Sequence, residues 1–133
     1  MNDAMHAAYG AYLQSLADLL LLRDWEVELK REWADADAYA QACTFDTENH
    51  IAIRVTEGFL GHPPEERREW LTHELLHAVM ARVNRGVARL GECVPDHLAV
   101  QLTCNQHEEE SEIVVQQLAR IIAPFLPLPP EMA

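Results

Sequence analysis

The sequence predicts an α+β domain with an N-terminal helix, a small antiparallel sheet, a buried central helix and a C-terminal helix that carries glutamates. Two observations lead to this prediction. Apolar residues recur at helical spacing in three stretches, and they alternate with polar residues between the first and the second stretch. The length of 133 residues suits a single domain, 1–133, in which about 126–133 form a proline-rich tail.

The first half of the chain predicts one helix and three strands. Tyrosines and leucines over about 5–22 share one helical face. From 25 to 30 the period changes to two, which indicates a half-buried strand. A weaker strand candidate covers 39–45, and a second alternating run covers 51–55. Because 46–49 has turn residues, the last two strands are expected to form a hairpin.

The second half of the chain predicts two main helices. The central one is expected over about 64–84, with prolines at its entrance and Gly86 as its stop. Its apolar residues surround the whole helix, which is typical of a buried helix. The segment 85–103 is ambiguous and contains a possible short helix near 95–103. The last helix is expected over about 105–125, before a run of prolines.

The central helix contains the most informative motif of the chain, His73-Glu74-Leu75-Leu76-His77, which has the pattern H-E-x-x-H. Residues four apart share a helix face, so His73 and His77 can direct two imidazoles at one metal ion. Glu74 lies on an adjacent stripe, where its carboxylate can take a proton from a metal-bound water. The structural alternative is a pair of hydrogen-bonded core histidines. A buried helix with three such side chains needs partners for them, and a metal would suffice.

The third metal ligand must come from elsewhere, and the candidates lie near the start of the last helix. Asn105 and Glu108 have the spacing of a capping box, which gives Glu108 a structural alternative. Glu112 lies in line with Ala119 and Ala123, whose small side chains would let another helix approach closely. The residues alone leave both glutamates open.

These features resemble the zincin metallopeptidases, and within them the gluzincins, which combine a small sheet, an H-E-x-x-H helix and a later helix that supplies a glutamate. The chain is also similar to small phage-related and bacterial metallopeptidases that pair H-E-L-L-H with a closing E-x-x-V-x-x-L-A. Here the closing residues are Glu112, Val115, Leu118 and Ala119. This resemblance implies Glu112 as the third ligand. An alignment with the gluzincin pattern E-x-x-S-D would instead make Glu108 the ligand; we prefer Glu112 because of the capping role expected for Glu108.

The resemblance further implies a zinc-dependent endopeptidase that binds one Zn²⁺ per chain through His73, His77 and Glu112. Zinc would acidify a bound water, and Glu74 would accept its proton and pass it to the leaving amine. The strand over 51–55 would form the edge of the sheet beside the cleft, where an extended peptide could add as a further strand.

No donor for a tetrahedral oxyanion stands out in the sequence. Tyr39, His97 and His107 are candidates by residue type only. The remaining histidines, His6, His50 and His62, have no spacing that recommends them as ligands.

Composition narrows the expected partners. The net charge of −12 argues against nucleic-acid binding, and no run of about 18 apolar residues could cross a membrane. The first residues do not resemble a signal peptide, and three scattered cysteines suggest reduced thiols. We therefore expect a cytoplasmic protein that acts on a protein or peptide, without a nucleic-acid or membrane partner. The oligomeric state is open and compatible with a monomer.

Two other functions stay open. The protein could be a regulatory zincin with one dedicated protein partner, similar to H-E-x-x-H proteins that cleave or bind bacterial repressors. It could also be a non-catalytic zinc-binding accessory domain of a phage or bacterium. Glu74 argues against a purely structural zinc site, because such a site needs no general base.

Overall fold

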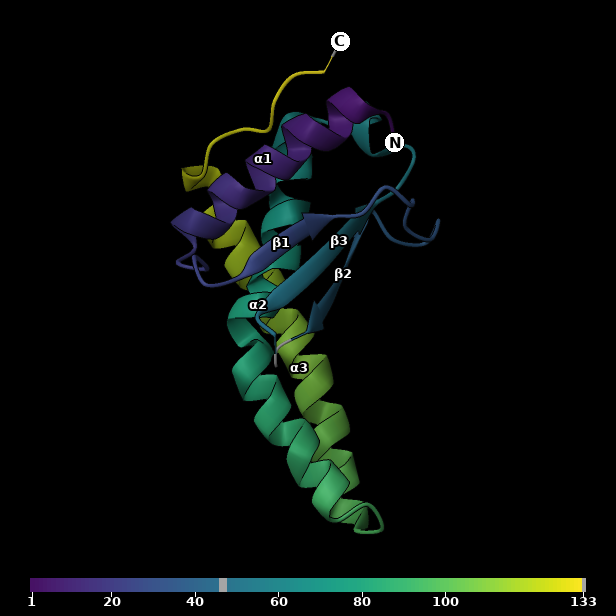
Figure 1. The fold of residues 1–133 in the computed structure, drawn as a ribbon. Coiled ribbons are helices and arrows are strands. Elements are labelled where there is room, and N and C mark those ends of the chain that lie inside the picture. Colours follow the sequence, from purple (N-terminus) through teal and green to yellow (C-terminus); the bar gives the residue numbers. More distant parts are fainter. Residues whose placement is uncertain (46–47, 133) are drawn as a thin grey trace.

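The computed structural model describes residues 1–45 and 48–132, and within them the fold is α+β, as predicted (Figure 1). Along the chain, one helix is followed by the three strands of a sheet and then by two long helices. Two short 3₁₀ turns occur at Phe59–Gly61 and Ala123–Phe125. The elements are α1 (Asp3–Leu19), β1 (Glu26–Leu29), β2 (Ala40–Phe45), β3 (His50–Val55), α2 (Pro64–Cys93) and α3 (Leu98–Ile122).

The sheet has the order β1-β3-β2 and is mixed. β2 and β3 form the expected antiparallel hairpin, whereas β1 pairs with β3 in parallel. The prediction of a fully antiparallel sheet was therefore wrong, since alternation of side chains reveals a strand but not its direction. The edge assignment of the 51–55 strand was also wrong, because β3 is central and the edge strand beside the metal-ligand candidates is β2. Two residues of the predicted turn, Asp46 and Thr47, lie outside the described part of the chain.

The core lies between the inner face of the sheet and the helices. Ile51, Ile53 and Val55 of β3 are buried on this face, which explains their alternation in sequence. α1 contributes its tyrosine and leucine face, and the first half of α2 adds Leu71 and Leu75 to the same cluster. α2 is therefore anchored in the core where it carries the H-E-x-x-H motif.

Both long helices extend further than predicted. α2 continues through Gly86 to Cys93, because this glycine keeps a negative φ and does not adopt the left-handed conformation that ends many helices. α3 begins at Leu98, capped by the His97 ring, so Asn105 is not an N-cap and the capping box with Glu108 does not form. The burial of α2 extends only as far as Ala81; beyond it, the helix is largely exposed.

The proline-rich tail is irregular and, over 126–132, packs against the body. The hydroxyl of Tyr12 donates to the carbonyl of Pro127 at 2.7 Å, and Pro129 is buried. In the described part of the chain, no helix combines the length and the apolar character needed to cross a membrane.

Candidate metal centre

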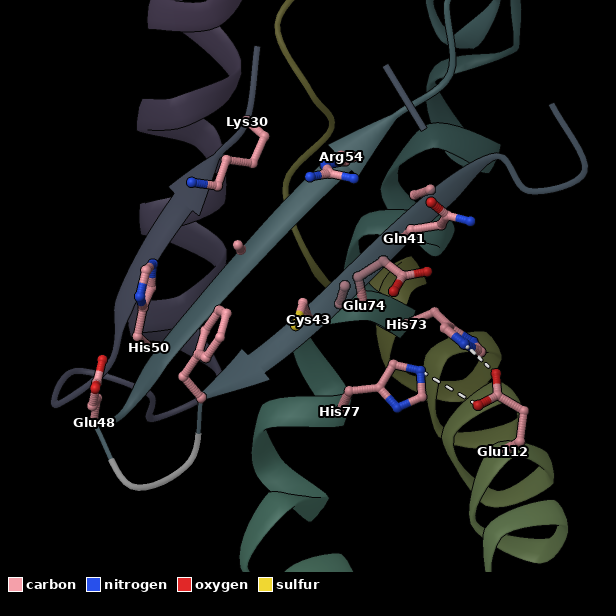
Figure 2. A pocket seen from close by; sticks show the side chains of 14 residues that line it. Lys30, Gln41, Cys43, Glu48, His50, Arg54, His73, Glu74, His77 and Glu112 are labelled. Carbon is pink, nitrogen blue, oxygen red and sulfur yellow. Dashed lines mark hydrogen bonds and ion pairs between the residues drawn. The ribbon is translucent and has the colours of Figure 1, made fainter. Parts of the chain in front are cut away.

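α2 and α3 bring three potential metal ligands together. His73 and His77 are one helical turn apart, and their ring centroids are separated by 5.0 Å. Glu112 of α3 faces both rings: its Oε1 lies 2.8 Å from Nε2 of His73, and its Oε2 lies 3.5 Å from Nε2 of His77 (Figure 2). One ligand atom from each residue lies within 4.8 Å of the others, so this cluster could hold a metal ion.

Close packing of the two helices places Glu112 opposite the histidines. Leu76 packs against Val115 and Ala119 in a small cluster between α2 and α3, and Ala119 is fully buried. As expected from their phase, Ala119 and Ala123 lie on the buried side of the helix pair. Small side chains at such a contact shorten the distance between helix axes.

A polar contact fixes the register of the same helices. Oδ1 of Asn84 accepts hydrogen bonds from Nε2 of His107 at 3.0 Å and from the hydroxyl of Ser111 at 3.2 Å. Ser111 is buried, so its hydroxyl needs this partner. Asn84, about two turns beyond His77, thereby ties α2 to the part of α3 that leads into Glu112.

The chemistry of the donor set fits a divalent transition metal. Two imidazole nitrogens and one carboxylate oxygen form a three-ligand set typical of catalytic zinc sites, which keep a fourth position open. The side chains become more exposed across the cluster, from 13% for His73 to 26% for His77 and 58% for Glu112. One side of the cluster is therefore accessible to a water or substrate atom.

Glu74 lies beside the cluster and is almost completely buried, at 8% exposure. Burial, and to a lesser extent the negative charge of Glu112, raise the pKa of its carboxyl to about 7. A hydrogen bond from the backbone amide of Ala42 opposes these effects. A carboxyl group with a pKa near neutral can both accept and release a proton at physiological pH.

The edge strand β2 borders the cluster. Just before β2, the carbonyl of Tyr39 accepts a hydrogen bond from the amide of Thr56, whereas within β2 the amide of Ala42 points outward to Glu74. Backbone groups of alternate residues point to opposite sides of a strand, so those of Ala40 and Thr44 also point outward. Figure 2 shows Glu74 next to this edge and the metal-ligand candidates beyond it.

A cavity of about 690 Å³ contains the cluster and extends over the outer face of the sheet, from β2 across β3 to the end of β1. His73, Glu74, His77 and Glu112 line one part of it, and residues of all three strands or their ends line the rest. A chain segment laid along β2 would therefore pass the four predicted site residues.

The structure distinguishes between the two glutamates that were considered as the third ligand. Glu108 lies one turn before Glu112 and lines a second cavity of about 380 Å³ between α2 and α3. Among the described residues, it does not belong to the group whose ligand atoms converge. The role that made Glu108 the weaker sequence candidate, the capping box, is absent as well.

The three candidates for an oxyanion donor have different positions. Tyr39 stacks on Trp70 with ring centroids 4.1 Å apart, and it borders a cavity shared with His73 and Glu74. His107 is held by Asn84, and His97 caps the start of α3. Of the three, Tyr39 lies beside the general base candidate.

Sequence reasoning missed the roles of the Ala42 amide and of the Asn84 side chain. Neither residue type signals a site, and their positions depend on strand pairing and helix register, which only the folded chain defines.

The candidate centre thus combines three ligand residues, one buried carboxyl and one strand edge. Comparisons with models of protein families, with curated proteins and with solved structures find no match for this chain.

Proposed function

We propose that the protein is a zinc-dependent metallopeptidase of the zincin type, in which His73, His77 and Glu112 bind one Zn²⁺ and Glu74 is the general base. The observation that supports this proposal most is the convergence of the three ligand atoms within 4.8 Å beside a buried carboxyl with a raised pKa. The open side of the cluster favours a catalytic metal over a structural metal that only stabilises the fold.

Zinc bound by these residues would polarise a peptide carbonyl and acidify a water molecule. Glu74 accepts a proton from the attacking water and delivers it to the amine nitrogen as the C–N bond breaks. The carboxyl lies beside the cluster and is buried, so it is in position for both transfers. Ala42 orients the carboxyl through its backbone amide.

The substrate would be a protein or peptide in extended conformation. Outward backbone groups of Ala40 and Thr44 offer hydrogen bonds to an added strand. Such a strand would run along the outward side of β2, with one of its peptide bonds next to His73, Glu74 and His77.

Metal content and hydrolysis in four proteins test this function. The wild type is expected to retain about one zinc per chain by elemental analysis, and Glu112→Ala to lose most of its affinity, because three protein ligands are typical of such sites. Glu108→Ala, the matched control one turn away, should keep the metal. Glu74→Gln should also keep zinc but lose hydrolysis of a quenched fluorescent peptide library.

The opposite pattern for the two alanine variants would show that Glu108 is the ligand. The peptidase function would be contradicted if the wild type binds stoichiometric zinc but hydrolyses no peptide, and if Glu74→Gln changes neither result. The metal site would then still stand.

A further inference from the structure

The distal part of the α2–α3 hairpin, residues 79–114, forms an arm that extends beyond the sheet. Figure 1 shows the two helices side by side below the strands, away from α1 and the tail. Within the described chain, the arm is held by contacts between its own two helices, such as those of Asn84 with α3. The side of the arm that carries Val79, Val83 and Leu90 is exposed to solvent.

The side of the arm opposite the metal centre carries an apolar stripe on α2, with Val114 of α3 beside it. On α2, the residues Val79, Val83, Gly86 and Leu90 follow one stripe, and the three large side chains are 46–56% exposed. Two positions along a helix correspond to a rotation of about 200°, so Val79 points away from the side that carries His77. Val114 stands in the same relation to Glu112 on α3 and is 39% exposed.

Gly86 lies within this stripe and has no structural role in the single chain. A Cβ atom built on it would meet nothing within 4 Å, and its backbone does not need a positive φ. Glycine in the middle of an exposed helix costs about 1 kcal/mol relative to alanine. Its benefit is that it allows close approach of another helix to the stripe.

Opposite charges border the apolar face. Arg82 lies next to Val79 and Val83 on the outer edge of α2, and Glu110 lies on the outer edge of α3, about 200° from Glu112. Neither Arg82 nor Glu110 has an ion-pair partner among the described residues. Asn84 binds both His107 and Ser111, so Arg82 and Glu110 are at about the same height along the hairpin.

We propose that this face binds a second copy of the chain and forms a twofold-symmetric four-helix bundle. If the twofold axis runs parallel to the helices, α2 of one protomer packs on α3 of its partner. Residues at the same level of the two hairpins then lie opposite each other. Arg82 of each protomer then faces Glu110 across the interface, and both valines and Gly86 are buried. The metal centre lies on the opposite side of the hairpin, so each cleft remains open and the dimer does not depend on the proposed function.

Sedimentation velocity of the full chain over a concentration series tests the dimer. The wild type should sediment with twice the mass of one chain. Val83→Glu should raise the dimer dissociation constant by about 100-fold or more, because a buried apolar contact is lost on both protomers. Ile113→Glu is the matched control, since Ile113 is 52% exposed on α3 but points away from this face. Circular dichroism would show that both variants stay folded.

A charge exchange tests the arrangement within the dimer. Arg82→Glu and Glu110→Arg should each weaken the dimer, and the double variant should restore it, whereas Glu109→Arg on another face of α3 should have no effect. A wild type that remains monomeric at every concentration would overturn the proposal. Equal disruption by Ile113→Glu would show that another surface is used, and failure of the double variant to recover would overturn the parallel-axis arrangement.

Discussion

At the scale of single residues, Glu74 shows how the fold changes the acidity of a side chain. The carboxyl is buried between the motif helix and the edge strand, where solvation of its charge is weak, and Glu112 adds a second negative charge nearby. A buried carboxylate that lacks a full set of partners destabilises the fold. Function at this position is therefore expected to cost stability.

The pH dependence of unfolding should reveal this cost in the metal-free protein. The folded pKa of Glu74, about 7, lies above the ordinary value of 4.5, so the folded state binds the extra proton between these values. Its contribution to stability is fully present below pH 4.5 and is lost as the pH rises through about 7. Glu74→Gln should therefore be more stable than the wild type at pH 8, by roughly 2–3 kcal/mol, with little difference at pH 4.5.

Urea unfolding at both pH values, in the presence of a chelator, measures this difference. Glu109→Gln provides the control for loss of an exposed charge and should change stability equally little at either pH. A Glu74→Gln variant less stable than the wild type at pH 8 would contradict the burial argument.

At the scale of elements, strand β2 and the helix pair surround the centre from different parts of the sequence. β2 supplies backbone groups, α2 supplies the histidines and α3 supplies Glu112. The small residues between α2 and α3 determine whether the carboxylate of Glu112 reaches both rings. A correct site therefore requires both strand pairing and helix register.

Proline substitutions along β2 distinguish its two backbone sides. Ala42→Pro removes an amide that points outward to Glu74, so the sheet should remain folded while hydrolysis falls strongly. Cys43→Pro is the matched control, because its amide points toward β3 and its loss should destabilise the sheet by about 1–3 kcal/mol. Thermal unfolding and peptide hydrolysis measure the two effects. Equal destabilisation by both prolines would show that the outward orientation of Ala42 is wrong.

The sequence reveals some of these elements and not others. The fixed spacing of His73 and His77 needs only a helix, and the phase of Ala119 correctly indicates the close helix contact. The direction of β1 and the central position of β3 depend on pairing between distant segments, which alternation does not encode. Gly86 and Asn105 are common helix boundaries, but here α2 and α3 support each other and continue through both positions.

At the scale of the whole molecule, the core and the centre are separate. The main core lies between the sheet, α1 and the first half of α2, and the tail closes it through Tyr12. The helix contact at Leu76, Val115 and Ala119 is apolar and needs no metal. The fold should therefore survive metal removal.

Chelation of the metal tests this separation. The metal-free protein is expected to keep its helical circular dichroism spectrum and a cooperative thermal transition. Zinc should raise the melting temperature, since binding at 100 times the dissociation constant adds about 2.7 kcal/mol to stability. His73→Ala, which lacks a ligand, should unfold like the metal-free wild type and should not respond to zinc. Loss of the helical spectrum on chelation would instead indicate an accessory domain whose fold depends on a structural zinc ion.

The central claim is that His73, His77 and Glu112 bind one catalytic zinc ion. A crystal structure of the zinc-loaded protein, with anomalous scattering recorded at the zinc edge, tests it most directly. We expect one ion bound by both imidazoles and by a Glu112 oxygen at about 2.0–2.2 Å, with a fourth position open to solvent beside Glu74. An ion bound by Glu108 in place of Glu112, or one with four protein ligands, would contradict this account.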